Sequence, residues 1–353
     1  MFKLKKLTQM NKSILLSLTV LSLLAAGCAK SSGDTTGKDA QERLSKWMGK
    51  YHPGIQPNED GLYILEDEPG TGELCDGETF PYVKIRGTIR TLEGTISSTT
   101  EEEVARQLGT YKFGNYYGAK YQYLGEGYSY AGLDALLSGM RLGGRRKAVI
   151  PAWMLTTSRY SSQEGYLNAC TSSTHLIYDI TPEYQVLDAE TDGISRVRRY
   201  INDNYPGTES TTYVEGVEAD DSFYFISDVS AFKEEDKLSD EASVSINYTG
   251  KLLDGTVFDT TIRKVAVDAR IDSDDKTYEP QSATISSTYS EVTLGESSSL
   301  ITGFQGALSL MHWKGQKAIA VFSSAHGYGS TGSGSVIPSY EPLIFEIEIL
   351  ADE

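Results

Sequence analysis

The residues with the clearest chemical potential are Tyr248, Phe258 and Asp259, which lie within one short stretch, VSINYTGKLLDGTVFDTT. At its start, β-branched and aromatic residues alternate with small polar ones, a pattern typical of a half-buried strand. An Asp-Gly turn dipeptide follows, and a second short strand returns the chain. We therefore expect a hydroxyl, an aromatic wall and a carboxylate to meet at the end of a strand pair.

The segments after this hairpin can be assigned by the same reasoning. An apolar stripe at i, i+3, i+4 and i+7 predicts a short helix that carries Phe304, Ala307, Leu308 and Met311. Apolar runs predict strands over Lys317–Phe322 and Leu343–Leu350. The loop between these strands contains the sequences HGYG, with Tyr328, and VIP, with Val336 and Ile337.

Together these segments resemble FKBP-type peptidyl-prolyl cis-trans isomerases. The family pattern reads V-x-V-x-Y-T-G, D-G and F-D, then L-G and V-I-x-G-W/F, then A-Y-G, then I-P and L-x-F-x-V-E-L. Nearly every piece occurs here in the same order. The resemblance implies an α+β fold in which an antiparallel β-sheet wraps around a short α-helix. It also implies isomerisation of X–Pro peptide bonds without a cofactor.

The same resemblance assigns candidate roles position by position. The walls and floor of an apolar pocket would come from Tyr248, Phe258, Phe304, Phe345, Leu300 and Ile301, the last with its amide facing the substrate carbonyl. Asp259 and the Tyr328 hydroxyl would orient bound carbonyls, and Val336 and Ile337 would close the loop side. Plain packing of a small sheet is the alternative for the aromatic residues, and turn capping is the alternative for Asp259.

The chain departs from the family pattern in several places. The insert Arg263–Ser290 is polar and charged, and it could be a flap, a partner site or an inert loop. Ser290 falls where the family keeps an aromatic residue, so one wall of the pocket could be missing. We expect His326 to be an exposed loop residue.

The chain also repeats itself. LEGT at Leu92 recurs as LDGT at Leu253, and LGE at Leu124 recurs at Leu294. These recurring sequences lie 161 and 170 residues apart. A repeat on that scale predicts two tandem FKBP-like domains, each with a helical lead-in. The expected boundaries are a leader at 1–27, a tether at 28–40, a degenerate domain at 41–187, a linker at 188–193 and an isomerase domain at 194–353.

The two copies differ where chemistry is expected. Aligning Val83 with Val244 puts Gly87 in the place of Tyr248, and Ser97-Ser98 in the place of Phe258-Asp259. Leu133 likewise replaces Phe304. We therefore expect the first domain to keep the framework and to be non-catalytic. Its tyrosines could instead recognise proteins or sugars, or pack as a Tyr-rich loop: Tyr111, Tyr116, Tyr117, Tyr121, Tyr123, Tyr128 and Tyr130.

The N-terminus indicates export. Lys3, Lys5, Lys6 and Lys12 precede an apolar run that is too short for a comfortable membrane span. It ends LAAGC, which resembles the lipobox of bacterial lipoproteins and makes Cys28 the lipidation site. An ordinary cleaved signal peptide is the alternative. We expect a cell-envelope protein, an outer-membrane lipoprotein facing either the periplasm or the cell surface.

Composition limits the partners and cofactors. The 353 residues include 49 acidic and 32 basic side chains, for a net charge of −17, which argues against a nucleic-acid partner. His52, His175, His312 and His326 are scattered, so no metal site is predicted. In an oxidising compartment Cys75 and Cys170 could pair, but the sequence does not show that they meet.

These inferences predict a lipid-anchored prolyl isomerase acting on proline-containing exported polypeptides. The second domain would be active and the first would not. The alternative is a non-enzymatic surface-binding lipoprotein or holdase chaperone on two FKBP scaffolds. The sequence leaves the oligomeric state open.

Overall fold

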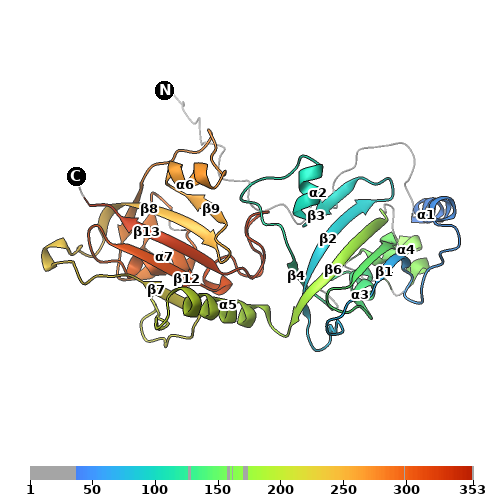
Figure 1. The fold of residues 1–353 in the computed structure, drawn as a ribbon, viewed down its shortest axis with the longest axis horizontal. Coiled ribbons are helices and arrows are strands. Elements are labelled where there is room, and N and C mark those ends of the chain that lie inside the picture. Colours follow the sequence, from blue (N-terminus) through green and yellow to red (C-terminus); the bar gives the residue numbers. More distant parts are fainter. Residues whose placement is uncertain are drawn as a thin grey trace, which may run out of the picture.

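The computed structural model describes residues 37–125, 129–156, 160, 162–169, 174–297 and 299–351. Within these residues the chain forms two lobes that lie side by side, each built on one antiparallel sheet (Figure 1). The predicted leader, the predicted lipidation site Cys28, Cys170 and Tyr128 lie outside the described residues. Pairing of Cys75 with Cys170 therefore stays a prediction.

The first sheet has the strand order β1-β5-β6-β2-β3, and β4 also pairs with β2. Its core contains the buried side of α3 (Ala131–Leu137), with Leu136 and Leu137 against Val83 and Ile180. The strands are β1 (Tyr63–Glu68), β2 (Tyr82–Thr91), β3 (Ile96–Thr99), β4 (Lys120–Tyr123), β5 (Arg145–Ile150) and β6 (Leu176–Val186).

The second sheet has the order β11-β10-β8-β13-β12-β7, and β9 also pairs with β8. The helix α7 (Thr302–Ser309) buries Phe304, Ala307 and Leu308 in its core, as the apolar stripe predicted. The strands are β7 (Phe223–Ile226), β8 (Ala242–Leu252), β9 (Val257–Thr260), β10 (Gln281–Ile285), β11 (Thr293–Leu294), β12 (Lys317–Phe322) and β13 (Leu343–Ile349).

The two sheets share one topology. β1, β5, β6 and β2 follow one another as β7, β12, β13 and β8 do, with a short strand hydrogen-bonded to the last member in each sheet. Local detail repeats as well: the hydroxyls of Thr88 and Thr99 lie 2.9 Å apart, and so do those of Thr249 and Thr260. The prediction of two tandem α+β domains of the same fold is confirmed.

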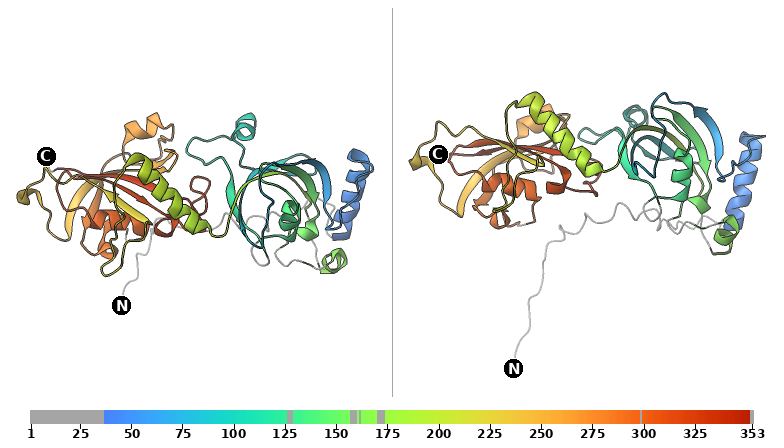
Figure 2. Two further views of the ribbon diagram at one scale, coloured as in Figure 1. Left: turned by 60° about the horizontal axis from the view of Figure 1, so that its bottom comes forward. Right: turned by 90° about the horizontal axis from the view of Figure 1, so that it is seen from below.

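Each domain also carries a longer helix on the other face of its sheet. In the first domain, α1 (Gly37–Tyr51) packs Leu44 and Met48 against Val149 and Ile177. In the second, α5 (Ala189–Asn204) packs Val197 and Ile201 against Tyr224, Val321 and Ile344. Figure 2 shows α5 along the second sheet and α1 at the far end of the first lobe. The remaining helices and turns are α2 (Glu102–Gln107), α4 (Gln163–Ala169), α6 (Arg263–Asp268), η1 (Ala152–Met154), η2 (Glu234–Asp236), η3 (Tyr289–Glu291) and η4 (Ser324–His326).

Two of the expected connecting segments overlap helices. The predicted tether 28–40 overlaps the first turn of α1, which begins at Gly37 and carries Asp39 at its N-terminal end. The predicted linker 188–193 is the cap and first turn of α5, where the Asp188 carboxylate accepts the Thr191 N–H at 2.7 Å. Acidic residues suit a helix N-terminus, so their polarity marked a helix start rather than a flexible joint.

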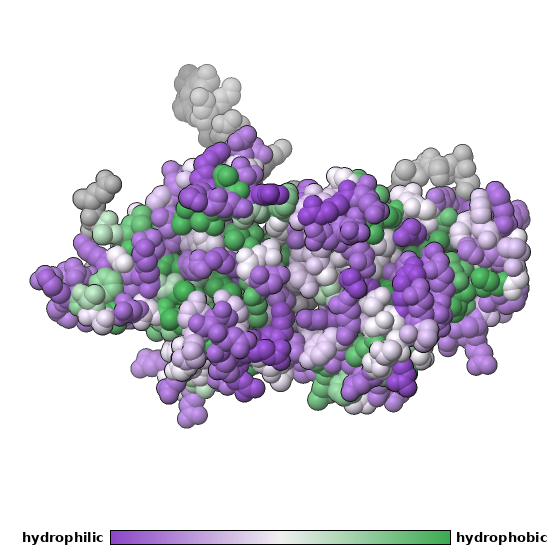
Figure 3. Space-filling view, in the orientation of Figure 1, coloured by the Kyte–Doolittle hydropathy of each residue, from purple (hydrophilic) through white to green (hydrophobic). Residues whose placement is uncertain are grey.

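The surface agrees with the acidic composition. The face shown in Figure 3 is covered largely by hydrophilic residues, with smaller apolar areas on both lobes. Within the described part of the chain, no helix has the length and apolarity needed to cross a membrane.

Candidate active site

The hairpin β8–β9 brings Tyr248 and Asp259 together. The Tyr248 N–H donates to Thr261 Oγ1 at 3.0 Å, which fixes the end of β9 against β8. A register shift after Gly250 changes the pairing of β9 with β8. As a result the Tyr248 hydroxyl donates to Asp259 Oδ2 at 2.8 Å. The other carboxylate oxygen accepts the Thr260 N–H at 2.9 Å. The predicted meeting of a hydroxyl and a carboxylate is therefore present.

Aromatic rings surround this polar pair. The Phe345 ring lies 5.0 Å from Phe304, 5.7 Å from Phe258 and 6.2 Å from Tyr248, measured between ring centroids. Phe304 and Phe345 are buried, whereas Tyr248 and Phe258 are half-buried and keep one side open. Gly250 permits the close approach, because a Cβ there would lie 2.5 Å from the Phe258 ring.

The start of α7 supplies the predicted floor. Ile301 caps this helix in an extended conformation, and its carbonyl accepts the N–H groups of Phe304 and Gln305. Leu300 and Ile301 are half-buried and pack against the same apolar cluster as Phe304 and Phe345. Because N–H groups at a helix start lack intrahelical acceptors, this end of α7 suits a carbonyl ligand.

The loop between β12 and β13 provides the last predicted residues. Ile337 is buried in the cluster and Val336 packs on it from a half-buried position. Tyr328 is 36% exposed, so it lies at the edge of the site rather than in the core. The loop is closed by backbone hydrogen bonds between Ser333 and Ile337 in both directions, at 2.7 and 3.1 Å.

Burial and charge keep both site tyrosines protonated. Burial, and then the Asp259 carboxylate, raise the pKa of Tyr248 well above the ordinary tyrosine value. The same two causes raise the pKa of Tyr328. Since Asp259 acts on both phenols, the structure brings Tyr248, Asp259 and Tyr328 into one electrostatic group whose hydroxyls remain donors.

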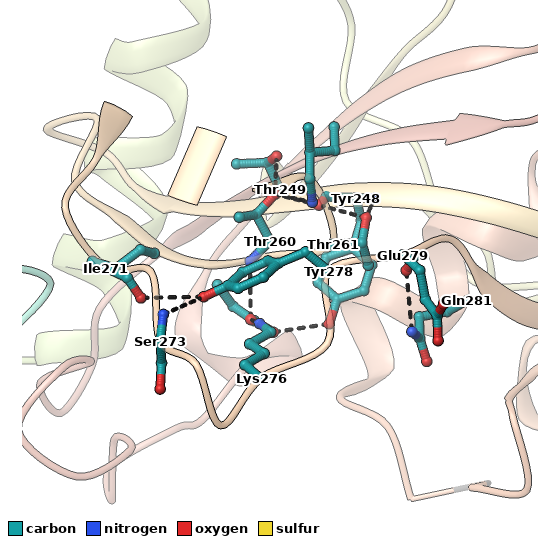
Figure 4. Close-up of polar contacts among 12 residues, drawn as sticks. Tyr248, Thr249, Thr260, Thr261, Ile271, Ser273, Lys276, Tyr278, Glu279 and Gln281 are labelled. Atoms are coloured by element: carbon teal, nitrogen blue, oxygen red, sulfur yellow. Dashed lines mark hydrogen bonds and ion pairs between the residues drawn. The ribbon is translucent and has the colours of Figure 1, made fainter. Parts of the chain in front are cut away.

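Sequence reasoning missed Lys276. The insert forms α6, a loop and β10, and its loop places the Lys276 ammonium in an ion pair with Asp259 Oδ1 (Figure 4). Tyr278 stabilises this loop: its hydroxyl accepts the Ser273 N–H at 3.0 Å and donates to the Ile271 carbonyl. The insert therefore contacts the candidate site. A single lysine after consecutive aspartates, in the sequence DSDDKTY, was the available signal.

His326 is not the exposed loop residue that we expected. Tyr213 Oη lies 2.7 Å from its Nδ1 and Ser222 Oγ lies 2.8 Å from its Nε2, and burial lowers its pKa. The Tyr213 ring packs on the core cluster and lies 5.0 Å from the Tyr289 ring. Tyr289, beside Ser290, thus places an aromatic ring next to the position that we expected to lack one.

The first domain lacks this constellation. Gly87 lies opposite Ile180 as Tyr248 lies opposite Ile347, so the register agrees with the sequence alignment. A Cβ on Gly87 would lie 2.2 Å from the Asp179 carbonyl oxygen, which leaves no room for a side chain. The described residues contain no cluster of His, Cys, Asp or Glu suited to a metal ion.

The fold and the site together define an aromatic-lined α+β domain of the prolyl isomerase type. A sequence model described as FKBP-type peptidyl-prolyl cis-trans isomerase matches residues 234–350. An FK506-binding protein of Neisseria meningitidis serogroup C is 34% identical over 107 residues, 30% of this chain and 76% of that protein. The chain therefore belongs to the FKBP-type peptidyl-prolyl cis-trans isomerase family.

Other relatives are also similar to a part of the chain. The FKBP-type 22 kDa peptidyl-prolyl cis-trans isomerase of Escherichia coli is 31% identical over 107 residues, 30% of this chain. The chain spans only 39% of the length of that relative. A crystal structure of a peptidyl-prolyl cis-trans isomerase from Pseudomonas syringae pv. tomato is similar over 46% of this chain and 92% of its own, with 23% identity and a TM-score of 0.31.

Proposed function

We propose that the second domain, residues 194–353, catalyses cis–trans isomerisation of X–Pro peptide bonds. The observation that carries this proposal is the ring cluster of Tyr248, Phe258, Phe304 and Phe345 around a Tyr248–Asp259 hydrogen bond. A half-buried aromatic surface beside oriented polar groups suits a proline ring and its flanking carbonyls.

The chemistry needs no nucleophile. Amide resonance holds the X–Pro bond behind a barrier of roughly 20 kcal/mol. At the top of that barrier the C–N bond is twisted and the charge separation between carbonyl and nitrogen is reduced. An apolar surface that removes water from the imide therefore favours the twisted state over the planar one. Phe258, Phe304 and Phe345 supply that surface.

The polar residues would orient the substrate. The Tyr328 hydroxyl, at the exposed edge of the site, would donate to a substrate carbonyl, and so would the Ile301 N–H at the start of α7. Asp259 would fix Tyr248 and accept a donor from the polypeptide when Lys276 moves aside. Leu300, Val336 and Ile337 would complete the apolar contacts.

The first domain would not catalyse. Ser98 stands at the position of Asp259, and the backbone fills the position of the Tyr248 side chain. We further propose, from the lipobox-like sequence at Cys28, that the protein is exported and lipid-anchored in the cell envelope. Its substrates would then be proline-containing exported polypeptides.

Binding without catalysis is the second candidate function. A groove of about 600 Å³ lies between the two domains. Its first-domain side holds the stacked rings of Tyr111 and Tyr117 and the 40% exposed Phe113. Exposed aromatic residues favour polypeptide contacts. This groove could hold an unfolded client without accelerating isomerisation.

Isomerisation of a proline tetrapeptide separates the two functions. We expect the chain to accelerate it and Asp259→Ala to lose most of the acceleration while remaining folded. Ser98→Ala, at the equivalent first-domain position, is the matched control and should leave the rate unchanged. A folded chain without acceleration would eliminate the isomerase proposal, and binding that is lost on Phe113→Ala would then favour a holdase.

A further inference from the structure

The chain from Tyr111 to Gly118, called here the bridging segment, belongs to the first domain but contacts the second. It connects α2 to β4 and reaches toward the loop that precedes β13 (Figures 1 and 2). The Tyr116 N–H donates to the Ser335 carbonyl at 2.9 Å. The Ser335 hydroxyl donates to Asn115 Oδ1 at 3.0 Å. Ser335 directly precedes Val336, a predicted substrate contact.

The bridging segment also contacts the opposite side of the site. A Cβ on Gly114 would lie 2.8 Å from Ile271 Cγ2 and 3.8 Å from the carbonyl oxygen of Val257. Val257 directly precedes Phe258, and Ile271 belongs to the insert that carries Lys276. Gly114 and Tyr116 are two residues apart, a span of at most about 7 Å. One short piece of chain therefore joins the hairpin side and the loop side of the site.

The Tyr116 ring takes part in the apolar cluster of the second domain. It is half-buried and packs against the cluster that contains Phe304 and Phe345. Its hydroxyl donates to the Ala119 carbonyl at 3.1 Å within the first domain, which holds the ring in place. Burial raises the pKa of Tyr116 to about 12. An aromatic residue from outside the residues matched by the family model thus packs on the apolar cluster to which Phe304 and Phe345 belong.

Two residues with left-handed backbone conformations also contact the first domain. Tyr340 and Arg270 adopt positive φ angles of 58° and 59°, which non-glycine residues rarely do. The Tyr340 ring lies 5.4 Å from Tyr82, a first-domain ring. The Arg270 guanidinium lies 5.0 Å from the centroid of Phe113. The side chains of both residues therefore contact the first domain. The left-handed backbone of Arg270 itself ends α6, where its N–H donates to the Val267 carbonyl at 3.0 Å.

We propose that the bridging segment is a wall of the isomerase site and that Tyr116 is a specificity-determining residue. This inference rests on the proposed prolyl isomerase function. Residues beside the proline on this side of the site pass the Tyr116 ring, so a bulky apolar residue there gains contact and a charged one does not. The first domain, although without the catalytic constellation, then takes part in choosing substrates.

Full-length variants and a series of peptides test this role. Tetrapeptides that carry alanine, leucine or glutamate before proline would be compared by kcat/KM. We expect Tyr116→Ala to lower the leucine-to-glutamate preference about 5-fold, because an aromatic contact is lost. Tyr116→Phe keeps the ring and should keep the preference. Tyr51→Ala, on α1 at the far end of the first lobe, should change nothing.

A general loss of stability would lower kcat/KM for all peptides by the same factor. The leucine-to-glutamate ratio therefore reports only the contact between the substrate and Tyr116. Hydrogen exchange of residues 328–340 gives a second readout that does not depend on activity. We expect faster exchange in Tyr116→Ala and wild-type exchange in Tyr116→Phe. An unchanged ratio, or unchanged exchange in Tyr116→Ala, would overturn the inference. If the wild-type chain were inactive, the proposed function would fail, and the exchange data alone would decide whether the wall contact exists.

Discussion

The Lys276 ammonium of the insert pairs with the Asp259 carboxylate that also accepts a hydrogen bond from the Tyr248 hydroxyl. The two charged groups are 39% and 38% exposed, so solvent screens the pair and limits its contribution to stability. Its main effect is on availability, because Lys276 joins the Tyr248 hydroxyl and the Thr260 N–H in occupying the two oxygens of the site carboxylate. A substrate donor must displace Lys276 to reach it.

Replacing Lys276 should therefore raise activity more than it changes stability. We expect Lys276→Met to lower the free energy of unfolding by less than about 1 kcal/mol and to raise kcat/KM about 2- to 5-fold. Salt should raise wild-type activity by weakening the pair, and the variant should not respond. Assays across a salt series would check this. Identical salt responses would mean that Lys276 does not compete with substrate.

Removing the Tyr248 hydroxyl tests the polar pair itself. Tyr248→Phe keeps the ring but leaves Asp259 without its 2.8 Å donor. We expect a loss of about 1–3 kcal/mol in stability, since this hydrogen bond involves a charged group, and a several-fold fall in kcat/KM. Urea denaturation and the tetrapeptide assay measure the two effects. A variant with wild-type values in both would show that the pair serves neither folding nor activity.

The contact between Gly250 and Phe258 predicts a cost for one methyl group. In Gly250→Ala the new Cβ would lie 2.5 Å from the Phe258 ring, so the ring must move. Because the ring is half-buried, it can swing outward toward solvent. We expect about 1 kcal/mol of destabilisation. Because the displaced ring belongs to the site, we also expect about a 10-fold loss of kcat/KM.

Gly49→Ala is the matched control for that substitution. Gly49 lies within α1, and a Cβ there meets no atom within 4 Å. The replacement should stabilise the protein by about 0.5–1 kcal/mol through helix propensity and leave activity unchanged. Equal activity of the two alanine variants would contradict a role for the Phe258 ring position.

The raised tyrosine pKa values predict loss of stability in alkali. Burial, and then Asp259, raise the folded-state pKa of Tyr248 above its ordinary value of 10.0. The unfolded chain therefore loses this proton first as pH rises. The stabilising contribution is complete below pH 10 and disappears as pH rises through the folded-state pKa.

Urea denaturation at about pH 8 and about pH 10.5 would measure this effect. We expect the free energy of unfolding to fall between the two, and to fall less in Tyr248→Phe, which has no phenol to ionise. Tyrosines whose pKa values burial raises to about 12 or further should account for much of the remaining fall: Tyr82, Tyr116, Tyr121, Tyr178 and Tyr224. If the free energy of unfolding of Tyr248→Phe fell with pH as it does in the wild type, Tyr248 would be excluded as a source of the alkaline instability.

Local sequence patterns predicted the parts of the site that lie on regular elements. Alternation placed Tyr248 on β8 and Phe345 on β13, and the apolar stripe placed Phe304 on α7, because strand and helix periods determine which side chains share a face. Lys276 escaped prediction because it reaches Asp259 from an irregular loop whose path no period describes. Tyr116 escaped because its contact with the second domain depends on how two separately folded units pack.

The close approach of β6 to Gly87 limits which side chains the first domain can accept at this position. Because the Asp179 carbonyl occupies the space that a Cβ would need, no single substitution can place a tyrosine at position 87. The backbone would first have to move apart, at a cost to the strand pairing that stabilises the domain. Substitutions that preserve this packing are therefore compatible with the first domain, whereas a side chain like that of Tyr248 requires a rearrangement of its sheet.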